Sequence, residues 1–115
     1  MELRVVVHVD ELEKWGLALA NMNNLINYCE EKGYEYAVEA LVNAAAVKEL
    51  REQDSQHKET INRLAEKGVV FAACRNALKG YEIDKKDVFA FVQVVPAGAA
   101  ELVEKQYEGY AYIRP

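Results

Sequence analysis

The chain alternates between apolar runs that are typical of buried strands and stretches whose apolar residues have helical spacing. The first run, Leu3–Val9, is almost continuously apolar and rich in valine. Such a run predicts a strand that is covered on both faces. From about Leu12 to Lys32 the apolar positions follow one helical stripe, and Gly33 stands where a helix would end. The start of the chain therefore predicts a strand followed by a helix.

The same alternation continues through the middle of the chain. Tyr36–Val42 predicts a second strand, and Val69–Ala73 predicts a third. Between them lies a strongly polar stretch, Lys48–Asn62, which we interpret as a short helix, a solvated turn near Asp54–Ser55 and the start of a second helix that reaches Gly68. A solvated connection accounts for this polarity, and a lid over a binding site is the alternative.

Two further helices and two further strands follow. A short helix is predicted to end near Gly80, and a fourth strand, Val92–Val95, stops at Pro96, because proline cannot continue a central ladder. Gly98–Glu108 has helical spacing, and Tyr110–Ile113 alternates like an edge strand.

Strands that alternate with helices predict a mostly parallel sheet, because parallel strands need crossover connections. We therefore expect an α/β fold, a three-layer α/β/α sandwich with a five-stranded, mostly parallel sheet, in a single domain over residues 1–115. The pattern does not fix the order of the strands in the sheet.

Composition narrows the possible partners. A formal net charge of -5 disfavours nucleic acids and anionic membranes, since an acidic surface cannot exchange counterions with them. No segment approaches the roughly 20 apolar residues that are needed to cross a bilayer. The apolar run near the N-terminus is too short, and its flanks are too charged, for a signal peptide. With two cysteines in a chain that needs no disulfide, we expect a reducing, cytoplasmic location.

Cys74 is the main candidate for chemistry. It closes the third apolar run and opens a helix, so its thiol would lie at the carboxyl edge of the sheet, beside the N–H groups of that helix and next to Arg75. Both features favour thiolate over thiol. The other cysteine, Cys29, lies in the apolar stripe of the first helix and reads as core.

Ligands of open α/β sheets bind beyond the carboxyl ends of the strands. The polar residues expected there are His8, Asp10, Asn43, Arg75 and Asn76, followed by the Pro96–Gly98 turn. His8 would bind a ligand or serve as a structural residue, and Asn43 would offer an amide or finish a turn. Asp10 is expected to cap the first helix, with Glu13 at capping-box distance.

Several familiar sites are missing from the sequence. There is no glycine-rich nucleotide-binding motif, no C-x-x-C pair and no serine in a nucleophile elbow. The two histidines, His8 and His57, are far apart and have no paired cysteines beside them, which disfavours zinc. We therefore expect no metal and no cofactor.

Four segments together resemble the DsrE/DsrF-like family, which includes the YchN-like proteins and the Tus sulfur-relay subunits. They are Gly68–Gly80 around the cysteine, Arg4–Glu11, Asn21–Leu25 and the ending Gln106–Pro115. The resemblance implies a compact α/β/α domain that forms homotrimers or homohexamers. It also implies that Cys74 carries sulfur as a persulfide between a donor and a thiol acceptor protein.

Function therefore has one leading hypothesis and two alternatives. The leading one is a sulfur carrier, or sulfurtransferase-like protein, that uses Cys74, with His8, Asn43, Arg75 and Asn76 as substrate-binding neighbours. The first alternative is a non-catalytic oligomeric module that binds a small ligand or a protein in the same crevice. The second is a thiol redox sensor, for which Cys29 would have to serve as the resolving cysteine.

Overall fold

Five parallel strands form one sheet in the computed structural model, which describes residues 1–115. Their order is β4-β3-β2-β1-β5, which answers the question that the sequence pattern left open. Every neighbouring pair is parallel, as crossover helices require. The strands are β1 (Glu2–Val9), β2 (Glu35–Val42), β3 (Val70–Cys74), β4 (Gln93–Val95) and β5 (Ala111–Ile113).

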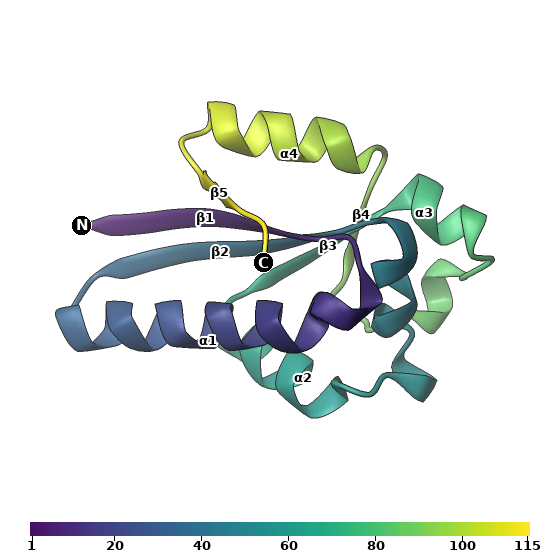
Figure 1. The fold of residues 1–115 in the computed structure, drawn as a ribbon, viewed down its shortest axis with the longest axis horizontal. Coiled ribbons are helices and arrows are strands. Elements are labelled where there is room, and N and C mark those ends of the chain that lie inside the picture. The colour runs from purple at the N-terminus through teal and green to yellow at the C-terminus, as the bar shows by residue number, and fades with distance from the viewer.

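Helices cover both faces of this sheet (Figure 1). The α-helices are α1 (Trp15–Lys32), α2 (Lys58–Glu66), α3 (Arg75–Gly80) and α4 (Gly98–Tyr107). Helices α1 and α2 lie on one face, α4 lies alone on the other, and α3 lies beyond the carboxyl end of β3. The expected three-layer α/β/α fold is confirmed. None of these helices combines the length and the hydrophobicity that crossing a membrane requires.

The two faces of the sheet are packed unequally. A cluster of 24 buried residues fills the face under α1 and α2. Trp15 is fully buried there, and its indole N–H donates to the carbonyl oxygen of Ala46 at 2.9 Å. On the α4 face the buried apolar cluster contains only Val6, Leu41 and Ala72. The hydrophobic driving force, which scales with buried apolar area, therefore favours the α1 face.

The start of α1 differs from the expectation. Asp10 does not cap it, since a 3-10 turn, Leu12–Lys14, precedes the helix and has no side-chain cap. The carboxylate of Asp10 instead accepts hydrogen bonds from the Arg114 guanidinium at 3.0 and 3.2 Å. This charge-assisted pair ties the residue after β5 to the residue after β1.

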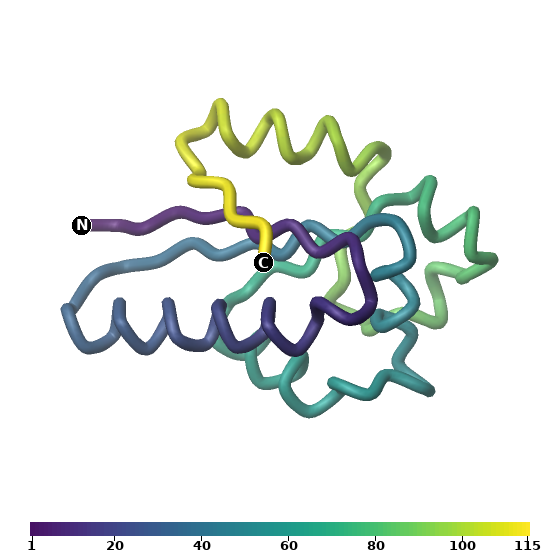
Figure 2. The backbone as a smooth tube through the Cα atoms, in the orientation of Figure 1, coloured from purple at the N-terminus to yellow at the C-terminus, as the bar shows by residue number.

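The polar segment after β2 also differs from the expectation in detail. It begins as 3-10 turns, Ala44–Leu50 and Glu52–Asp54, and becomes α-helical only in α2. Val47 and Leu50 are fully buried, so the first turn packs against the core and does not stand free in solvent. The tube in Figure 2 shows this segment beside the carboxyl ends of the strands. A 3-10 turn, Lys85–Asp87, leads toward β4.

Candidate functional site

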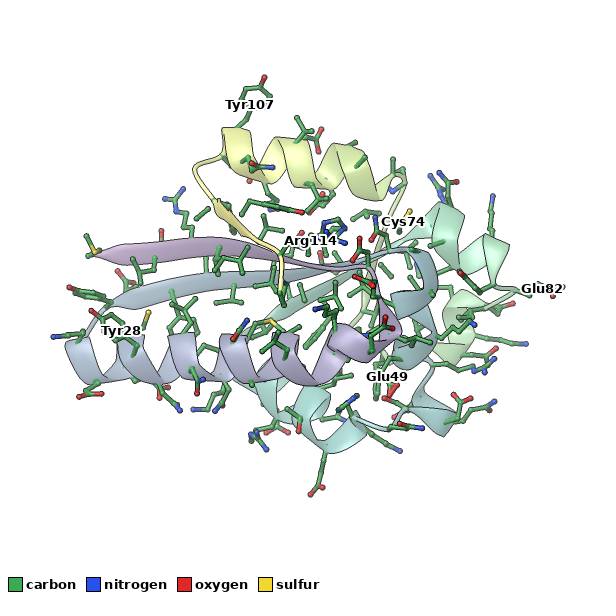
Figure 3. The ribbon with its side chains drawn as sticks, in the orientation of Figure 1. Tyr28, Glu49, Cys74, Glu82, Tyr107 and Arg114 are labelled. Carbon is green, nitrogen blue, oxygen red and sulfur yellow. The ribbon has the colours of Figure 1, made fainter.

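Cys74 is the last residue of β3, and it is 8% exposed to solvent. Strand side chains alternate between faces, so Cys74 shares the α4 face with Ala72, two residues earlier. Its Sγ accepts a hydrogen bond from the backbone N–H of Gly98, the first residue of α4, at 3.4 Å. Figure 3 shows Cys74 near the turn that leads into α4.

This arrangement corrects one detail of the sequence interpretation. The helix expected to donate to the thiol was the one that follows Cys74 directly, and Cys74 is indeed the N-cap residue of α3. Its side chain makes no capping hydrogen bond there, because strand alternation directs it to the α4 face. The positive end of a different helix, α4, therefore lies beside the sulfur, where it stabilises a sulfur anion.

Gly98 permits this close approach. A Cβ built on Gly98 would lie 3.2 Å from the Cβ of Cys74 and 3.4 Å from the Cβ of Asn43. The first distance is shorter than ordinary van der Waals contact, and the second lies at its lower limit. The absence of a side chain at Gly98 thus lets the first peptide of α4 reach the sulfur.

His8 and Asn43 are hydrogen bonded to each other on the same face. The Nε2 of His8 lies 2.9 Å from the Oδ1 of Asn43, and its Nδ1 lies 2.7 Å from the Tyr112 hydroxyl. Asn43 follows β2 directly, one step beyond the Val42 and Ala73 register pair, which places it opposite Cys74. The structure therefore brings His8, Asn43 and Cys74 to one edge of one sheet face.

Arg75 and Asn76 occupy a different surface. Both are exposed at the start of α3, and neither side chain is hydrogen bonded to His8, Asn43 or Cys74. Arg75 lines a surface groove together with Lys79 and Val94. Val94 precedes Val95, the register partner of Cys74, so it faces the opposite side of the sheet. The two residues remain candidates for contact with an incoming molecule.

Two residues near the site were missed by sequence reasoning. Tyr112 joins it because β5 pairs with β1 in a register that sets Tyr112 opposite Val6, next to His8. No local sequence pattern predicts the contact between Tyr112 and His8. Glu39 had a visible signal, since it is a carboxylate inside the otherwise apolar second strand.

Glu39 lies under α4 on the same face of the sheet as Asn43, four residues before it. It is 5% exposed, its Oε2 has no hydrogen-bond partner, and its Oε1 lies 3.8 Å from the Lys105 Nζ. Burial raises the pKa of Glu39 to about 8, the neighbouring Glu101 carboxyl adds to the rise, and Lys105 opposes it. A carboxyl group of raised proton affinity therefore lies beneath the helix that contacts the sulfur.

The remaining chemistry of the site is that of one thiol. Both cysteines are free, and Cys29 is fully buried on α1, which covers the opposite face from Cys74. No group of three or more His, Cys, Asp or Glu side chains is arranged to hold a metal ion. The site can therefore offer a nucleophilic sulfur, a backbone N–H donor and the side chains of His8 and Asn43.

The fold and the site define a class of small parallel α/β/α proteins with a thiol at the carboxyl edge of the sheet. The chain belongs to the DsrE/DsrF-like family, whose model matches residues 5–115. Its structure is similar to that of MTH1491 from Methanobacterium thermoautotrophicum, a protein of unknown function. That similarity has a TM-score of 0.89 and 34% sequence identity, and it covers 98% of this chain and 99% of the other.

No curated protein matches the chain. Membership of the DsrE/DsrF-like family suggests a role related to sulfur relay, and members of this family often form oligomers.

Proposed function

We propose that the protein is a sulfur carrier that holds sulfane sulfur as a persulfide on Cys74 and passes it to an acceptor thiol. The observation that carries this proposal is the position of the Cys74 Sγ, which accepts the Gly98 N–H at the N-terminus of α4. A helix N-terminus supports a sulfur anion without a separate base.

The chemistry balances without a cofactor. The Cys74 thiolate attacks the outer sulfur of a donor persulfide, a new S–S bond forms, the donor's own S–S bond breaks, and the donor leaves as a thiolate. In the second step an acceptor thiolate attacks the outer sulfur held on Cys74, and Cys74 leaves as the thiolate. The outer sulfur keeps its oxidation state throughout, so neither step consumes an oxidant or a reductant.

The neighbours of Cys74 have separate parts in the proposal. His8 and Asn43 lie on the sulfur's own face, so they would contact the transferred atom. Arg75 and Asn76 are exposed at the start of α3, so they would contact the donor or acceptor protein. The remaining parts of the proposal are a cytoplasmic single-domain protein, a homotrimer or homohexamer, and separate donor and acceptor proteins.

Intact-mass spectrometry tests the carrier role. After incubation with a persulfide donor, we expect the wild-type protein to gain one sulfur atom, and peptide mapping should place it on Cys74. A Cys74→Ser variant should gain none, whereas the matched Cys29→Ser variant should gain as much as wild type, because Cys29 is buried on the other side of the sheet. A wild-type protein that never gains sulfur from several donors would contradict the proposal.

The burial of Cys74 favours a second candidate function, a non-catalytic binding module. A residue that is only 8% exposed presents little of its thiol to a donor. If Cys74 is merely packed, its alkylation by iodoacetamide at neutral pH should be no faster than that of a small model thiol. Alkylation faster than the model thiol, together with sulfur loading, would exclude this reading.

A further inference from the structure

Three polar side chains form a row of hydrogen bonds that leads from β5, through β1, to the residue that follows β2. The Tyr112 hydroxyl and the His8 Nδ1 are 2.7 Å apart, and the His8 Nε2 and the Asn43 Oδ1 are 2.9 Å apart. The first pair joins residues 104 positions apart in the sequence. A sulfur carrier that needed only a thiol would not require these two hydrogen bonds.

The Asn43 amide turns its oxygen toward His8. Oδ1 is an acceptor only, so the His8 Nε2 must carry the proton, and in the neutral ring Nδ1 then accepts from the Tyr112 hydroxyl. Tyr112 thereby holds the ring of His8 in place, and His8 in turn holds the oxygen of the amide.

The other end of the amide is free. The Asn43 Nδ2 has two N–H groups, and no atom of the protein accepts a hydrogen bond from them. Strand β2 lies between β1, which carries His8, and β3, which carries Cys74. With Oδ1 held toward β1, the amide nitrogen is turned to the side of Asn43 where Cys74 lies.

We propose that Tyr112, His8 and Asn43 form a positioning relay that directs the Asn43 amide N–H toward the outer sulfur of a Cys74 persulfide. This inference rests on the proposed function and names the group that receives the transferred atom. The Gly98 N–H binds the inner sulfur, which is the Cys74 Sγ itself. The Asn43 N–H binds the second sulfur, which carries negative charge when the persulfide is ionised.

Two variants test the relay. Asn43→Asp keeps an acceptor for His8 but replaces the amide donor with a negatively charged oxygen, so we expect persulfide loading to fall about tenfold or more, the scale of a lost charge-assisted hydrogen bond. Tyr112→Phe keeps the ring and removes only the hydroxyl, so we expect a smaller fall, about threefold. Asn27→Asp is the matched control, because it makes the same change on the exposed surface of α1 and should load like wild type.

Loading is measured by mass spectrometry as the fraction of Cys74 that holds an extra sulfur at equilibrium with a fixed ratio of small-molecule persulfide to thiol. The iodoacetamide alkylation rate of unloaded protein is measured beside it. A positioning role predicts that Tyr112→Phe lowers loading but leaves alkylation of the bare thiol unchanged.

The outcomes separate the two proposals. If wild type takes no sulfur at all, both the carrier function and the relay are overturned. If wild type loads and both variants load equally well, the carrier stands and the relay is wrong. If Tyr112→Phe alters the alkylation rate as much as it alters loading, the hydrogen bonds of Tyr112 are only a structural support, and the relay is again overturned.

Discussion

The buried carboxyl of Glu39 should make the stability of the protein fall as the pH rises. It lies between β2 and α4, is 5% exposed, and has an Oε2 without a hydrogen-bond partner. Its pKa in the folded protein is raised to about 8, from 4.5 for the free group, chiefly by burial and then by Glu101. Replacing Glu39 with glutamine removes the ionisation while keeping nearly the same shape.

The direction of the change in stability with pH follows from how many protons the folded and unfolded states bind. Below pH 4.5 the carboxyl is neutral in both the folded and unfolded states, so it contributes no pH dependence. Between pH 4.5 and about 8 the unfolded chain has lost this proton while the folded protein retains it, so each rise in pH favours unfolding. Above about pH 8 both states are ionised and the loss is complete.

The magnitude follows from the same two values. At about 1.4 kcal/mol for each unit of pKa, a rise from 4.5 to about 8 corresponds to at most about 5 kcal/mol. Relaxation of α4 away from an ionised Glu39 would reduce the penalty, so we expect a loss of about 2 to 4 kcal/mol in the wild-type free energy of unfolding between pH 5 and pH 9. The Glu39→Gln variant should lack this loss.

Urea unfolding at several pH values measures the difference. Trp15, the one tryptophan, is fully buried and reports the transition by its fluorescence. Glu104→Gln makes the same substitution on the exposed surface of α4, so it should follow the wild-type curve. Parallel wild-type and Glu39→Gln curves from pH 5 to pH 9 would refute the argument, as would a wild type that gains stability relative to Glu39→Gln on the alkaline side.

Two further substitutions test the packing, one beside the Cys74 thiol and one on the opposite side of the sheet. Gly98→Ala should lower the free energy of unfolding by about 1 to 2 kcal/mol and reduce sulfur loading, because its Cβ would lie 3.2 Å from that of Cys74; urea unfolding and mass spectrometry measure the two effects. Its matched control, Gly16→Ala in α1, has open space around the new Cβ and should raise stability by up to about 1 kcal/mol. A neutral Gly98→Ala would contradict the close contact. Cys29→Ala should cost about 1 to 2 kcal/mol through a small cavity, yet leave loading of Cys74 unchanged in the mass assay; lost loading would implicate Cys29 in the chemistry.

The elements of this fold follow from local patterns. The valine-rich run that became β1 and the helical stripe that became α1 are both readable within a few residues, and the glycine at position 33 adopts the positive φ of 72° that ends the helix. A parallel sheet then follows, because each crossover leaves its strands pointing the same way. Cys74 was found by the same reasoning, since it closes a strand.

What the sequence could not supply were contacts set by strand register and charge. Asp10 looked like a helix cap, but its partner is Arg114, 104 residues later. Tyr112 reaches His8 only because β5 adds to the free edge of β1. The helix beside the sulfur proved to be α4 and not α3, which depends on the face of the sheet that each crossover covers. Such pairings have no periodicity in the sequence.

The unequal packing of the two faces has a consequence for motion. The buried apolar cluster under α4 has three residues, against 24 in the cluster on the side of α1 and α2, so less apolar area must be exposed when α4 lifts from the sheet. Local opening is easiest where the fewest apolar contacts are lost. We therefore expect the backbone amides of α4 to exchange with solvent deuterium earlier than those of α1. Each such opening withdraws the Gly98 N–H from Cys74, so in the proposed function the opening rate of α4 would limit how often a donor or an acceptor reaches the sulfur.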